Sequence, residues 1–334
     1  GDNVISILPM AHMYGMAFEF LFEFLFGCHV FYLTRVPSPA IIAAAFAEVK
    51  PAIIIAVPWV IEKINRKKVL PKIQTNRMRL LLNMPFVNKK VFEKIREQVV
   101  NAFGGKFYEI IVGGAAFNQE VEQFLQRIEF PYTVGYGATE CAPIICYADC
   151  HDFVAGSCGK PVVHMEVKID SPDPQNVPGE ILARGLNVML GYFKNEEATA
   201  QTLDADGWYH TGDLGLMDAD GNVFIKGRSK NMLLGASGQN IYPEEIEDKL
   251  NSLNMVNECI VVQRGEKLVG LVYPDFDEAA TMQLNDSDLE NIMEENRQEL
   301  NASQPPYCRL AAIEIVKEEF EKTPKKSIKR YLYK

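Results

Sequence analysis

The feature that most constrains this chain is the alternation of short apolar runs with helical segments along its first 150 residues. Runs rich in β-branched residues at 4–8, 53–57 and 108–112 are each followed by a segment with helical spacing of apolar residues. That order is typical of parallel strands joined by helices that cover both faces of the sheet. Residues 1–155 are therefore predicted to form an α/β subdomain around a parallel sheet.

The pattern changes twice further along the chain. Between residues 156 and 228, strand-like runs at 166–169, 179–184 and 223–226 are separated by Pro and Gly, which predicts a small antiparallel, barrel-like β subdomain. After the Gly-Arg-Ser-Lys sequence at 227–230, helical and strand-like segments mix again. We therefore expect a separate α+β carboxyl-terminal domain over residues 229–334.

The excess of acidic over basic residues argues against a nucleic-acid partner. The 334 residues carry 34 Lys and Arg against 44 Asp and Glu, a formal net charge of −10. A protein whose main function is to bind nucleic-acid phosphates usually has the opposite balance. No nucleic-acid partner is expected.

The cysteines and the first residues indicate a reducing compartment. Seven cysteines without a Cys-x-x-Cys pair, in a chain of this length, favour free thiols over disulfides. The group Cys146, Cys150, His151 and Cys158 matches no standard zinc spacing, so buried thiols are preferred over a metal site. Because the first residues include Asp2 and no basic segment, no signal peptide is predicted, and the expected location is cytoplasmic.

Residues 13–33 are as apolar and as long as a membrane span, but they contain Glu19, Glu23 and His29. Each carboxylate would cost about 3 kcal/mol at the centre of a bilayer. We therefore predict a buried helix followed by a strand and no transmembrane segment, with peripheral membrane contact left open. Since the two glutamates are four residues apart, they share a helix face and can reach solvent or a polar neighbour.

Four glycine-containing segments carry the polar side chains of interest. The first, Gly-Gly-Ala-Ala at 113–116, precedes a helix opened by Asn118, and its small residues let a flat ligand approach the backbone. The second, at 136–140, presents the ring of Tyr136, the hydroxyl of Thr139 and the carboxylate of Glu140. These groups suit a base, a phosphate and Mg²⁺ respectively. A plain turn capped by Thr139 is an alternative of equal weight.

The third and fourth segments hold an acid and a base. Asp213 stands between glycines in a predicted turn at 208–215, where its carboxylate suits a bidentate contact with a ribose diol. A plain turn aspartate is the simpler explanation of that residue alone. Arg228 stands at the predicted domain boundary, where it can contact a ligand in an interdomain cleft.

In this order and spacing, the four segments resemble the adenylate-forming (AMP-binding) superfamily of acyl-CoA synthetases, peptide-synthetase adenylation domains and luciferases. The opening Leu-Pro-Met-Ala-His-Met-Tyr-Gly at 8–15 is similar in particular to the long-chain fatty acyl-CoA synthetases. The resemblance extends from residue 4 to the end of the chain. It implies a two-step ligase in which a fatty acid and ATP give acyl-AMP and pyrophosphate, after which CoA displaces AMP.

The resemblance also implies roles for individual residues. For ATP or AMP these are Gly113, Gly114, Ala115, Ala116 and Tyr136 around adenine, Gly137 beside them, Thr139 at the phosphate, and Asp213 and Arg228 at the ribose. Glu140 would hold Mg²⁺, and Asn231 would be the hinge of a mobile carboxyl-terminal domain. His12 would lie near the entrance of the acyl pocket, where a satisfied core histidine is the alternative.

The sequence departs from the family pattern in two places. The family's Ser/Thr/Gly-rich phosphate loop lies upstream of residue 8, and Gly-Gly-Lys-Phe at 104–107 does not replace it because it lacks the spacing of a P-loop. The chain is therefore expected to be the carboxyl-terminal part of a longer enzyme, with at most trace activity alone. The family's adenylation lysine matches Ser327, so Lys326 is the nearest catalytic candidate, alongside Thr139 and Glu140.

Two other functions are compatible with the same residues. An aryl-CoA ligase or an acyl-carrier-protein ligase would differ only in its acid or its acceptor. A module that binds AMP or acyl ligands without catalysis would fit the absent phosphate loop and Ser327.

Overall fold

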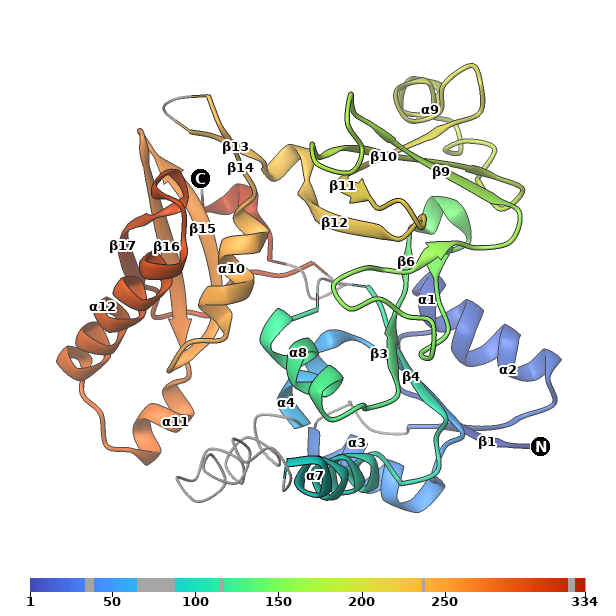
Figure 1. The fold of residues 1–334 in the computed structure, drawn as a ribbon, viewed down its shortest axis with the longest axis horizontal. Coiled ribbons are helices and arrows are strands. Elements are labelled where there is room, and N and C mark those ends of the chain that lie inside the picture. The colour runs from blue at the N-terminus through green and yellow to red at the C-terminus, as the bar shows by residue number, and fades with distance from the viewer. Residues whose placement is uncertain (34–38, 65–87, 115–116, 236–237, 324–327, 334) are drawn as a thin grey trace. The chain divides into compact units, whose positions relative to one another are not determined.

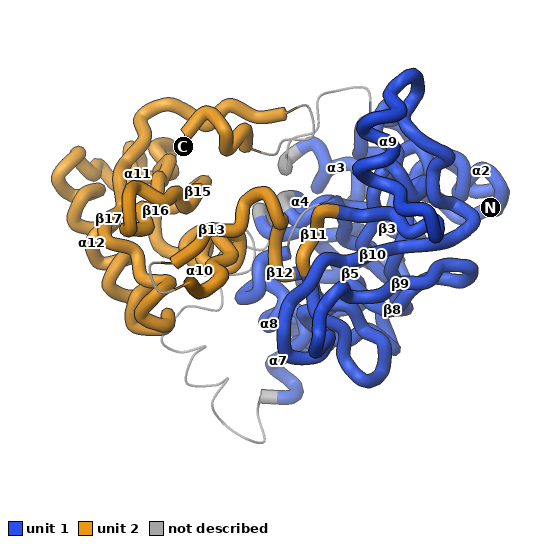
Figure 2. Tube along the Cα trace, turned by 90° about the horizontal axis from the view of Figure 1, so that it is seen from above, with its two compact units in different colours: residues 1–211, 215–225 blue, residues 212–214, 226–334 orange. Residues whose placement is uncertain are grey.

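The computed structural model describes residues 1–33, 39–64, 88–114, 117–235, 238–323 and 328–333. The chain forms two compact units, one made of residues 1–211 and 215–225 and the other of residues 212–214 and 226–334 (Figure 2). Parallel sheets, antiparallel sheets and helices follow one another along the chain (Figure 1), which confirms the predicted α/β class. The predicted boundaries at residues 155 and 228 stay predictions.

The first unit is built around a three-stranded parallel sheet. Its strands, in spatial order, are β3 (Ile53–Ala56), β4 (Glu109–Val112) and β5 (Tyr132–Val134). The helices between and before them are α3 (Pro39–Val49), α4 (Pro58–Ile64), α7 (Asn88–Ala102) and α8 (Gln119–Arg127). Phe46 of α3 and Leu125 of α8 are fully buried in one hydrophobic core with Ile110 of β4. Apolar residues at helical spacing therefore cover the β-branched strands, as the sequence predicts.

The amino-terminal segment forms a two-stranded parallel sheet and a helix. Strand β1 (Asn3–Ser6) pairs with β2 (His29–Tyr32), and between them lie α1 (Met13–Met16), the π-helical turn η1 (Ala17–Leu21) and α2 (Phe22–Leu25). The predicted helix followed by a strand is confirmed. The prediction that this helix is buried is wrong for its aromatic side, because large apolar side chains of η1 and α2 are exposed. In the described part of the chain, no helix is both long enough and apolar enough to span a membrane.

Two antiparallel sheets complete the β structure around the first unit. One contains β6 (Tyr136–Gly137), β7 (Ile144–Tyr147) and β8 (Lys160–Pro161). The other has the order β12-β11-β10-β9, with β9 (Met165–Asp170), β10 (Gly179–Gly185), β11 (Tyr209–Met217) and β12 (Val223–Arg228), while α9 spans Glu196–Thr202.

The predicted turn at 208–215 is wrong, because residues 209–217 form strand β11. Alternate residues Tyr209, Thr211, Asp213 and Gly215 are buried, which is the period of a strand. The strand was predicted as a turn because it contains two glycines, Gly212 and Gly215. A Cβ on Gly215 would lie 2.7 Å from the carbonyl oxygen of Phe224, so this glycine serves close packing between strands rather than a turn.

The second unit has its own core. The antiparallel pair β15 (Val256–Arg264) and β16 (Lys267–Pro274) is extended by β17 (Leu310–Ile315), which runs parallel to β16. The other elements are β13 (Leu233–Leu234), β14 (Asn240–Ile241), α10 (Pro243–Asn251), α11 (Phe276–Thr281) and α12 (Asp286–Ser303). Leu250, Val272 and Leu289 belong to the hydrophobic core that these helices and strands share.

Candidate nucleotide site

The first predicted segment begins where β4 ends. The backbone N–H of Gly113 donates to the carbonyl of Ala56 at 3.0 Å, and a Cβ on Gly113 would lie 3.0 Å from the ring of Tyr14. Gly114 has a φ of +87°, which favours glycine. Both glycines are therefore explained by local geometry, at the sheet edge where α/β folds bind ligands. Ala115 and Ala116 lie outside the described residues.

Asn118 opens α8 as predicted. Its side chain accepts a hydrogen bond from the N–H of Val121 at 3.1 Å, which is the geometry of an N-cap. The side chain of Asn118 thus caps α8 immediately after the glycine segment.

The second segment forms β6 and the short 3₁₀ helix η3 (Thr139–Cys141). Tyr136 is 7% exposed, and a Cβ on Gly137 would clash with the carbonyl of Pro143, the residue that precedes β7. Ala138 is the residue that precedes η3, and no side chain caps it, so the capping interpretation of Thr139 is wrong. The side chain of Thr139 is exposed, which leaves its hydroxyl accessible to a ligand.

Glu140 is half-buried beside two tyrosines, Tyr192 and Tyr209, whose contact with it no local sequence pattern indicates. The hydroxyl of Tyr192 donates to its Oε1 at 2.8 Å, and Tyr209 on β11 hydrogen-bonds to the same carboxylate. Burial, followed by the Glu140 carboxylate, raises the pKa of both tyrosines, so both hydroxyls remain protonated donors. Tyr192 lies 52 residues beyond Glu140 in sequence, and no local pattern joins the two.

The oxygens around Glu140 fit a hard divalent cation. Mg²⁺ is usually held by one or two protein carboxylates together with substrate phosphates and water. Here one half-exposed carboxylate stands next to the exposed hydroxyl of Thr139, and the tyrosine hydroxyls fix its orientation. The residues present therefore suit the ion that the sequence predicts.

Asp213 and Arg228 lie together in the structure. The Nε of Arg228, the last residue of β12, is 2.7 Å from the Oδ1 of Asp213 on β11. The Asp213 side chain is 8% exposed and that of Arg228 is 62% exposed. The acid is thus embedded in the sheet, and the guanidinium presents its other N–H groups outward, where hydroxyls or an anion can accept them.

The predicted hinge residue, Asn231, is hydrogen-bonded to a glutamate of helix α10. Asn231, at the end of the 3₁₀ helix η4 (Ser229–Asn231), donates from Nδ2 to the Oε1 of Glu244 at 2.7 Å. The next residue of α10, Glu245, pairs with Lys226 at 3.0 Å. The segment from β12 to η4 is thus attached to the start of α10 at two points.

The basic tail is attached to the second unit by ion pairs. The Nζ of Lys322 lies 2.6 Å from the Oε1 of Glu258, and the Nζ of Lys329 lies 3.1 Å from the Oε2 of Glu321. The guanidinium of Arg330 pairs with the carboxylate of the buried Glu247. An antiparallel bridge between Lys322 and Ile328 joins the two ends of the intervening segment. Each described cation between residues 322 and 330 therefore has a carboxylate partner. Lys326 and Ser327 lie outside the described residues.

His12 caps the helix of the opening motif. Its Nδ1 accepts a hydrogen bond from the backbone N–H of Tyr14 at 3.2 Å, and its side chain is half-buried. The hydroxyl of Tyr14 in turn donates to the carbonyl of Ile111 on β4 at 3.2 Å. The motif is thus joined to the central sheet, and contact of His12 with an acyl chain stays a prediction.

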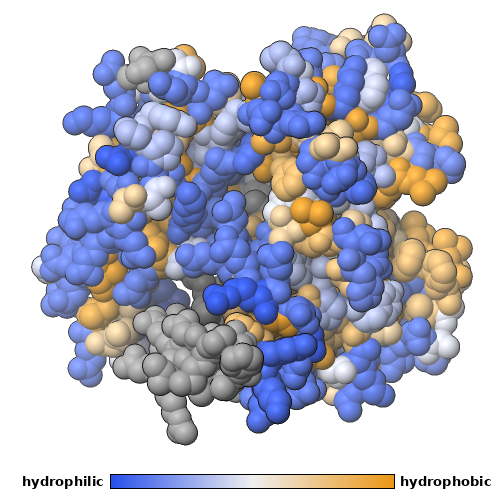
Figure 3. All heavy atoms as spheres, in the orientation of Figure 1, coloured by the Kyte–Doolittle hydropathy of each residue, from blue (hydrophilic) through white to orange (hydrophobic). Residues whose placement is uncertain are grey.

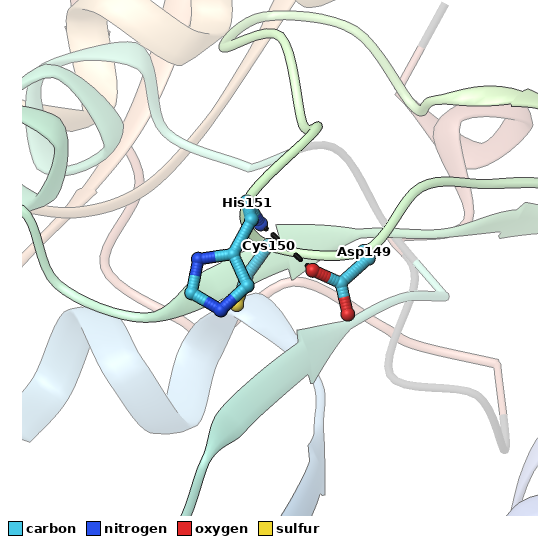
Figure 4. Close-up of side chains that lie close together, drawn as sticks. All are labelled: Asp149, Cys150 and His151. Carbon is cyan, nitrogen blue, oxygen red and sulfur yellow. Dashed lines mark hydrogen bonds between the residues drawn. The ribbon is translucent and has the colours of Figure 1, made fainter.

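All seven cysteines are free, and four of them, including Cys146 and Cys158, are buried. Asp149, Cys150 and His151 bring their ligand atoms within 4.8 Å of one another at the surface (Figure 4). Burial, Glu109 and Asp149 raise the pKa of Cys150 to about 11, which keeps it a protonated thiol. The N–H of Cys150 also donates to Glu109, the first residue of β4, so this group lies at the opposite end of β4 from Gly113. It is not part of the candidate nucleotide site.

Comparison with protein families decides the classification. The family model described as "AMP-binding enzyme" matches residues 1–193, and the one described as "AMP-binding enzyme C-terminal domain" matches residues 230–333. This chain belongs to the AMP-binding enzyme family. The resemblance drawn from the four segments is thereby confirmed.

This family member is similar to several curated ligases. It is 32% identical over 287 residues to long chain acyl-CoA synthetase 7, peroxisomal, of Arabidopsis thaliana, a match that covers 78% of this chain and 40% of that protein. It is 29% identical over 307 residues to long-chain-fatty-acid–CoA ligase 1 of Saccharomyces cerevisiae, a match that covers 82% of this chain and 42% of that protein. It is 29% identical over 339 residues to 4-coumarate–CoA ligase 2 of Oryza sativa subsp. japonica. That match covers 95% of this chain and 51% of that protein. The chain spans about half or less of the length of these relatives.

Solved structures of the family share its fold. A crystal structure of an anthranilate CoA ligase in complex with anthranoyl-AMP matches with a TM-score of 0.77 at 20% identity, covering 100% of this chain and 59% of that chain. An o-succinylbenzoate CoA synthetase from Bacillus subtilis, in complex with ATP and magnesium, matches with a TM-score of 0.72 at 21% identity, covering 99% and 61%. These likenesses confirm the predicted combination of α/β and α+β parts.

Proposed function

We propose that the protein to which this chain belongs is an ATP-dependent acid–thiol ligase, with a long-chain fatty acid as its first candidate substrate. The observation that carries the proposal is the match of both AMP-binding enzyme models in order along the chain. The three relatives described above are named as CoA ligases or as an acyl-CoA synthetase, and two of these three are named for long-chain substrates. The opening motif at residues 8–15 supports the same choice.

The first half-reaction joins the acid to AMP. A carboxylate oxygen attacks the α-phosphorus of ATP, the bond from that phosphorus to the oxygen bridging to the β-phosphate breaks, and pyrophosphate leaves. Tyr136 and the glycines at 113 and 114 would line the adenine, while Asp213 and Arg228 would bind the ribose hydroxyls. Thr139 would donate to a phosphate. Such positioning and charge neutralisation supply most of the rate in reactions of this class.

Glu140 would hold Mg²⁺, whose charge neutralises phosphate oxygens when it is bound. The Tyr192 hydroxyl, 2.8 Å from Oε1, would keep the carboxylate in one orientation. In the second half-reaction the CoA sulfur attacks the acyl carbon, the bond from that carbon to the AMP oxygen breaks, and the thiol proton passes to solvent or a base.

Lys326 is our candidate for the cation that meets the acid and the α-phosphate during adenylation. The ion pairs of the tail support this choice, because Lys322, Lys329 and Arg330 each face a carboxylate. A cation already paired with a carboxylate contributes less field at a distant anion. Lys325 is the alternative within the same segment.

A substrate panel on the full-length protein tests the function. Pyrophosphate release and thioester formation are measured with hexadecanoate and 4-coumarate, each with free CoA and with an acyl-carrier protein. We expect release with hexadecanoate and transfer to free CoA. Binding of AMP without pyrophosphate release from any acid would instead support a non-catalytic module.

An aryl acid is the second candidate. The 4-coumarate–CoA ligase 1 of Narcissus pseudonarcissus is 36% identical to this chain, although over 192 residues that cover 53% of it. A higher kcat/KM for 4-coumarate than for hexadecanoate in the same panel would favour this substrate class.

Separate measurement of the two half-reactions tests the role of Lys326. In the full-length protein, Lys326→Ala should slow acyl-AMP formation by about two orders of magnitude, which is typical for loss of a charge that stabilises a transition state. Thioester formation from preformed acyl-AMP should change little. A large effect of Lys325→Ala with none of Lys326→Ala would assign the role to Lys325.

The present chain by itself should show at most trace adenylation. Its sequence lacks the phosphate-loop donors that would neutralise the leaving pyrophosphate, a contribution worth several kcal/mol in comparable sites. Turnover of about one per second or faster by the 334 residues alone would contradict this expectation.

A further inference from the structure

Asp149, Cys150 and His151 bring three kinds of metal-binding atom together at the surface of the first unit. A carboxylate oxygen, the Sγ and a ring nitrogen all lie within 4.8 Å of one another (Figure 4). This set differs from the four residues considered in the sequence, because Cys146 and Cys158 are buried in a hydrophobic core. None of the three gathered residues has a role in the proposed ligase reaction.

A tight turn lets three successive side chains converge. The backbone N–H of Asp152 donates to the carbonyl of Asp149 at 2.9 Å, and the N–H of His151 donates to the Oδ1 of Asp149 at 2.9 Å. An aspartate at the first position of a turn commonly accepts such bonds. In a strand, successive side chains would point to opposite faces, so the turn is what brings the three ligand atoms to one place.

The turn is anchored to two strands of the central sheet. The hydroxyl of Thr133 on β5 donates to the carbonyl of Ala148 at 2.6 Å. The carboxylate of Glu109, the first residue of β4, accepts the hydroxyl of Tyr147 at 2.7 Å and the backbone N–H of Cys150 at 3.3 Å. The ligand atoms are therefore held in position before an ion binds, which lowers the entropic cost of binding.

Glu109 is a buried carboxylate that lacks a cation. It is 3% exposed, and in the described part of the chain it forms no ion pair with a Lys, Arg or His side chain. The thiol of Cys150 hydrogen-bonds to it, so the carboxylate lies directly beside the three ligand atoms. Buried charges in proteins are normally paired or coordinate a metal. A cation held by the neighbouring turn would supply the opposite charge.

We propose that Asp149, Cys150 and His151 bind a transition-metal ion, with Zn²⁺ as the first candidate and water as its fourth ligand. Sulfur and imidazole nitrogen select such ions over Mg²⁺ and Ca²⁺, which prefer oxygen. Zn²⁺ takes Cys, His and Asp ligands in tetrahedral sites, and three protein ligands leave the fourth position for water. Binding forms a Zn–S bond, and the thiol proton that it displaces passes to solvent.

A cavity of about 300 Å³ adjoins this site. Cys150 and His151 line it together with the rings of Phe130, Tyr132 and Phe153. An apolar wall lowers the local dielectric, which strengthens the attraction between an ion and its ligands. The site uses none of the residues assigned to the nucleotide or to Mg²⁺, so the proposal does not depend on the proposed function.

Zinc titration of the 334-residue chain tests the proposal without an activity assay. After removal of metals with EDTA, we expect calorimetry to show one Zn²⁺ ion per chain, which excess Mg²⁺ does not displace. Cys150→Ser and His151→Ala should each weaken binding by about 100-fold or more, because loss of a mere hydrogen-bond partner of a ligand already costs about 10- to 100-fold. Cys308→Ser is the matched control, since Cys308 is also a half-buried free cysteine, and it should bind Zn²⁺ as wild type does.

Co²⁺ in place of Zn²⁺ gives a spectroscopic arm. We expect a sulfur-to-cobalt charge-transfer band in wild type and in Cys308→Ser, and none in Cys150→Ser. Thermal unfolding without metal shows whether each variant folds, and the exposed position of His151 makes His151→Ala the safer variant in that respect. Absence of Zn²⁺ binding by wild type, or equal affinity in wild type and both ligand variants, would overturn the proposal. Displacement of Zn²⁺ by Mg²⁺ would also overturn it, because it would indicate an unselective group of carboxylates.

Discussion

Two buried glutamates, one in each unit, show two ways of accommodating a carboxylate. Glu19 and Glu247 are 1% and 8% exposed, and burial raises the pKa of each to about 7. Glu19 is satisfied by backbone N–H groups and a serine hydroxyl, without a cation. Glu247 accepts the N–H of Val261 and pairs with Arg330 of the tail. The first arrangement fixes a helix locally, and the second ties the chain's last segment to its sheet.

The comparison extends to the surroundings of each carboxylate. The helix around Glu19 leaves an apolar face exposed, whereas α10, around Glu247, contributes Ile246 and Leu250 to a closed core. The second unit thus supplies its own partners, both apolar and charged. The first unit satisfies the polar groups around Glu19 but leaves apolar side chains of this helix exposed, as Figure 3 shows over α2.

Removal of the cation from the Glu247 pair should have the largest effect. Arg330→Met leaves a buried carboxylate without its partner, which typically costs about 3–5 kcal/mol of unfolding free energy. Urea denaturation followed by a probe in the second unit measures the loss. Arg264→Met is the matched control, because its pair with Glu314 is exposed and should be worth less than about 1 kcal/mol. Equal losses from the two variants would show that the tail is not anchored through Glu247.

Removal of the Glu19 carboxylate should have the next largest effect. Glu19→Ala strands the N–H groups of Ile7 and Leu8 and the hydroxyl of Ser6, for a loss of about 1–3 kcal/mol in unfolding free energy. Glu23→Ala is the control, because the carboxylate of Glu23 is hydrogen-bonded by the single thiol of Cys28. A larger loss from Glu23→Ala would contradict the role given to Glu19.

The pH dependence of stability should distinguish Glu19 from an ordinary surface carboxylate. Its pKa is about 7 in the folded chain against an ordinary value of 4.5, so the folded state binds the extra proton between these values. This contribution to stability is fully present below pH 4.5 and is lost as the pH rises through about 7. The difference in unfolding free energy between wild type and Glu19→Gln should therefore change between pH 5 and pH 8. A constant difference over that range would show that the pKa is not raised.

Local signals predicted the fold well where one residue or one period decides the structure. The β-branched runs gave the parallel strands, and Asn118 gave the start of α8. Strand β11 was missed because its glycines, which serve close packing and a φ of +70° at Gly212, look like turn residues. The outward side of the helix at 13–25 was missed because its orientation depends on acceptors for residues 6–8 rather than on hydrophobicity.

The candidate site divides in the same way. Glu140, Asp213 and Arg228 stand out in the sequence because each lies in a recognisable segment. Tyr192 does not, since its contact with Glu140 spans 52 residues and depends on how two loops pack. The pairing of Arg330 with Glu247 spans 83 residues and is equally invisible to local pattern.

Calorimetry of AMP binding to this chain and to its Asp213→Ala variant tests the central claim most directly. We expect wild type to bind AMP weakly, because the residues assigned to base and ribose are present. Loss of the carboxylate that pairs with Arg228 and that we assign to the ribose hydroxyls should weaken binding by about 1–3 kcal/mol, which is roughly 5- to 150-fold. Asp206→Ala, at an exposed position outside the site, should bind AMP as wild type does. No AMP binding by wild type, or equal affinity in wild type and Asp213→Ala, would contradict the account.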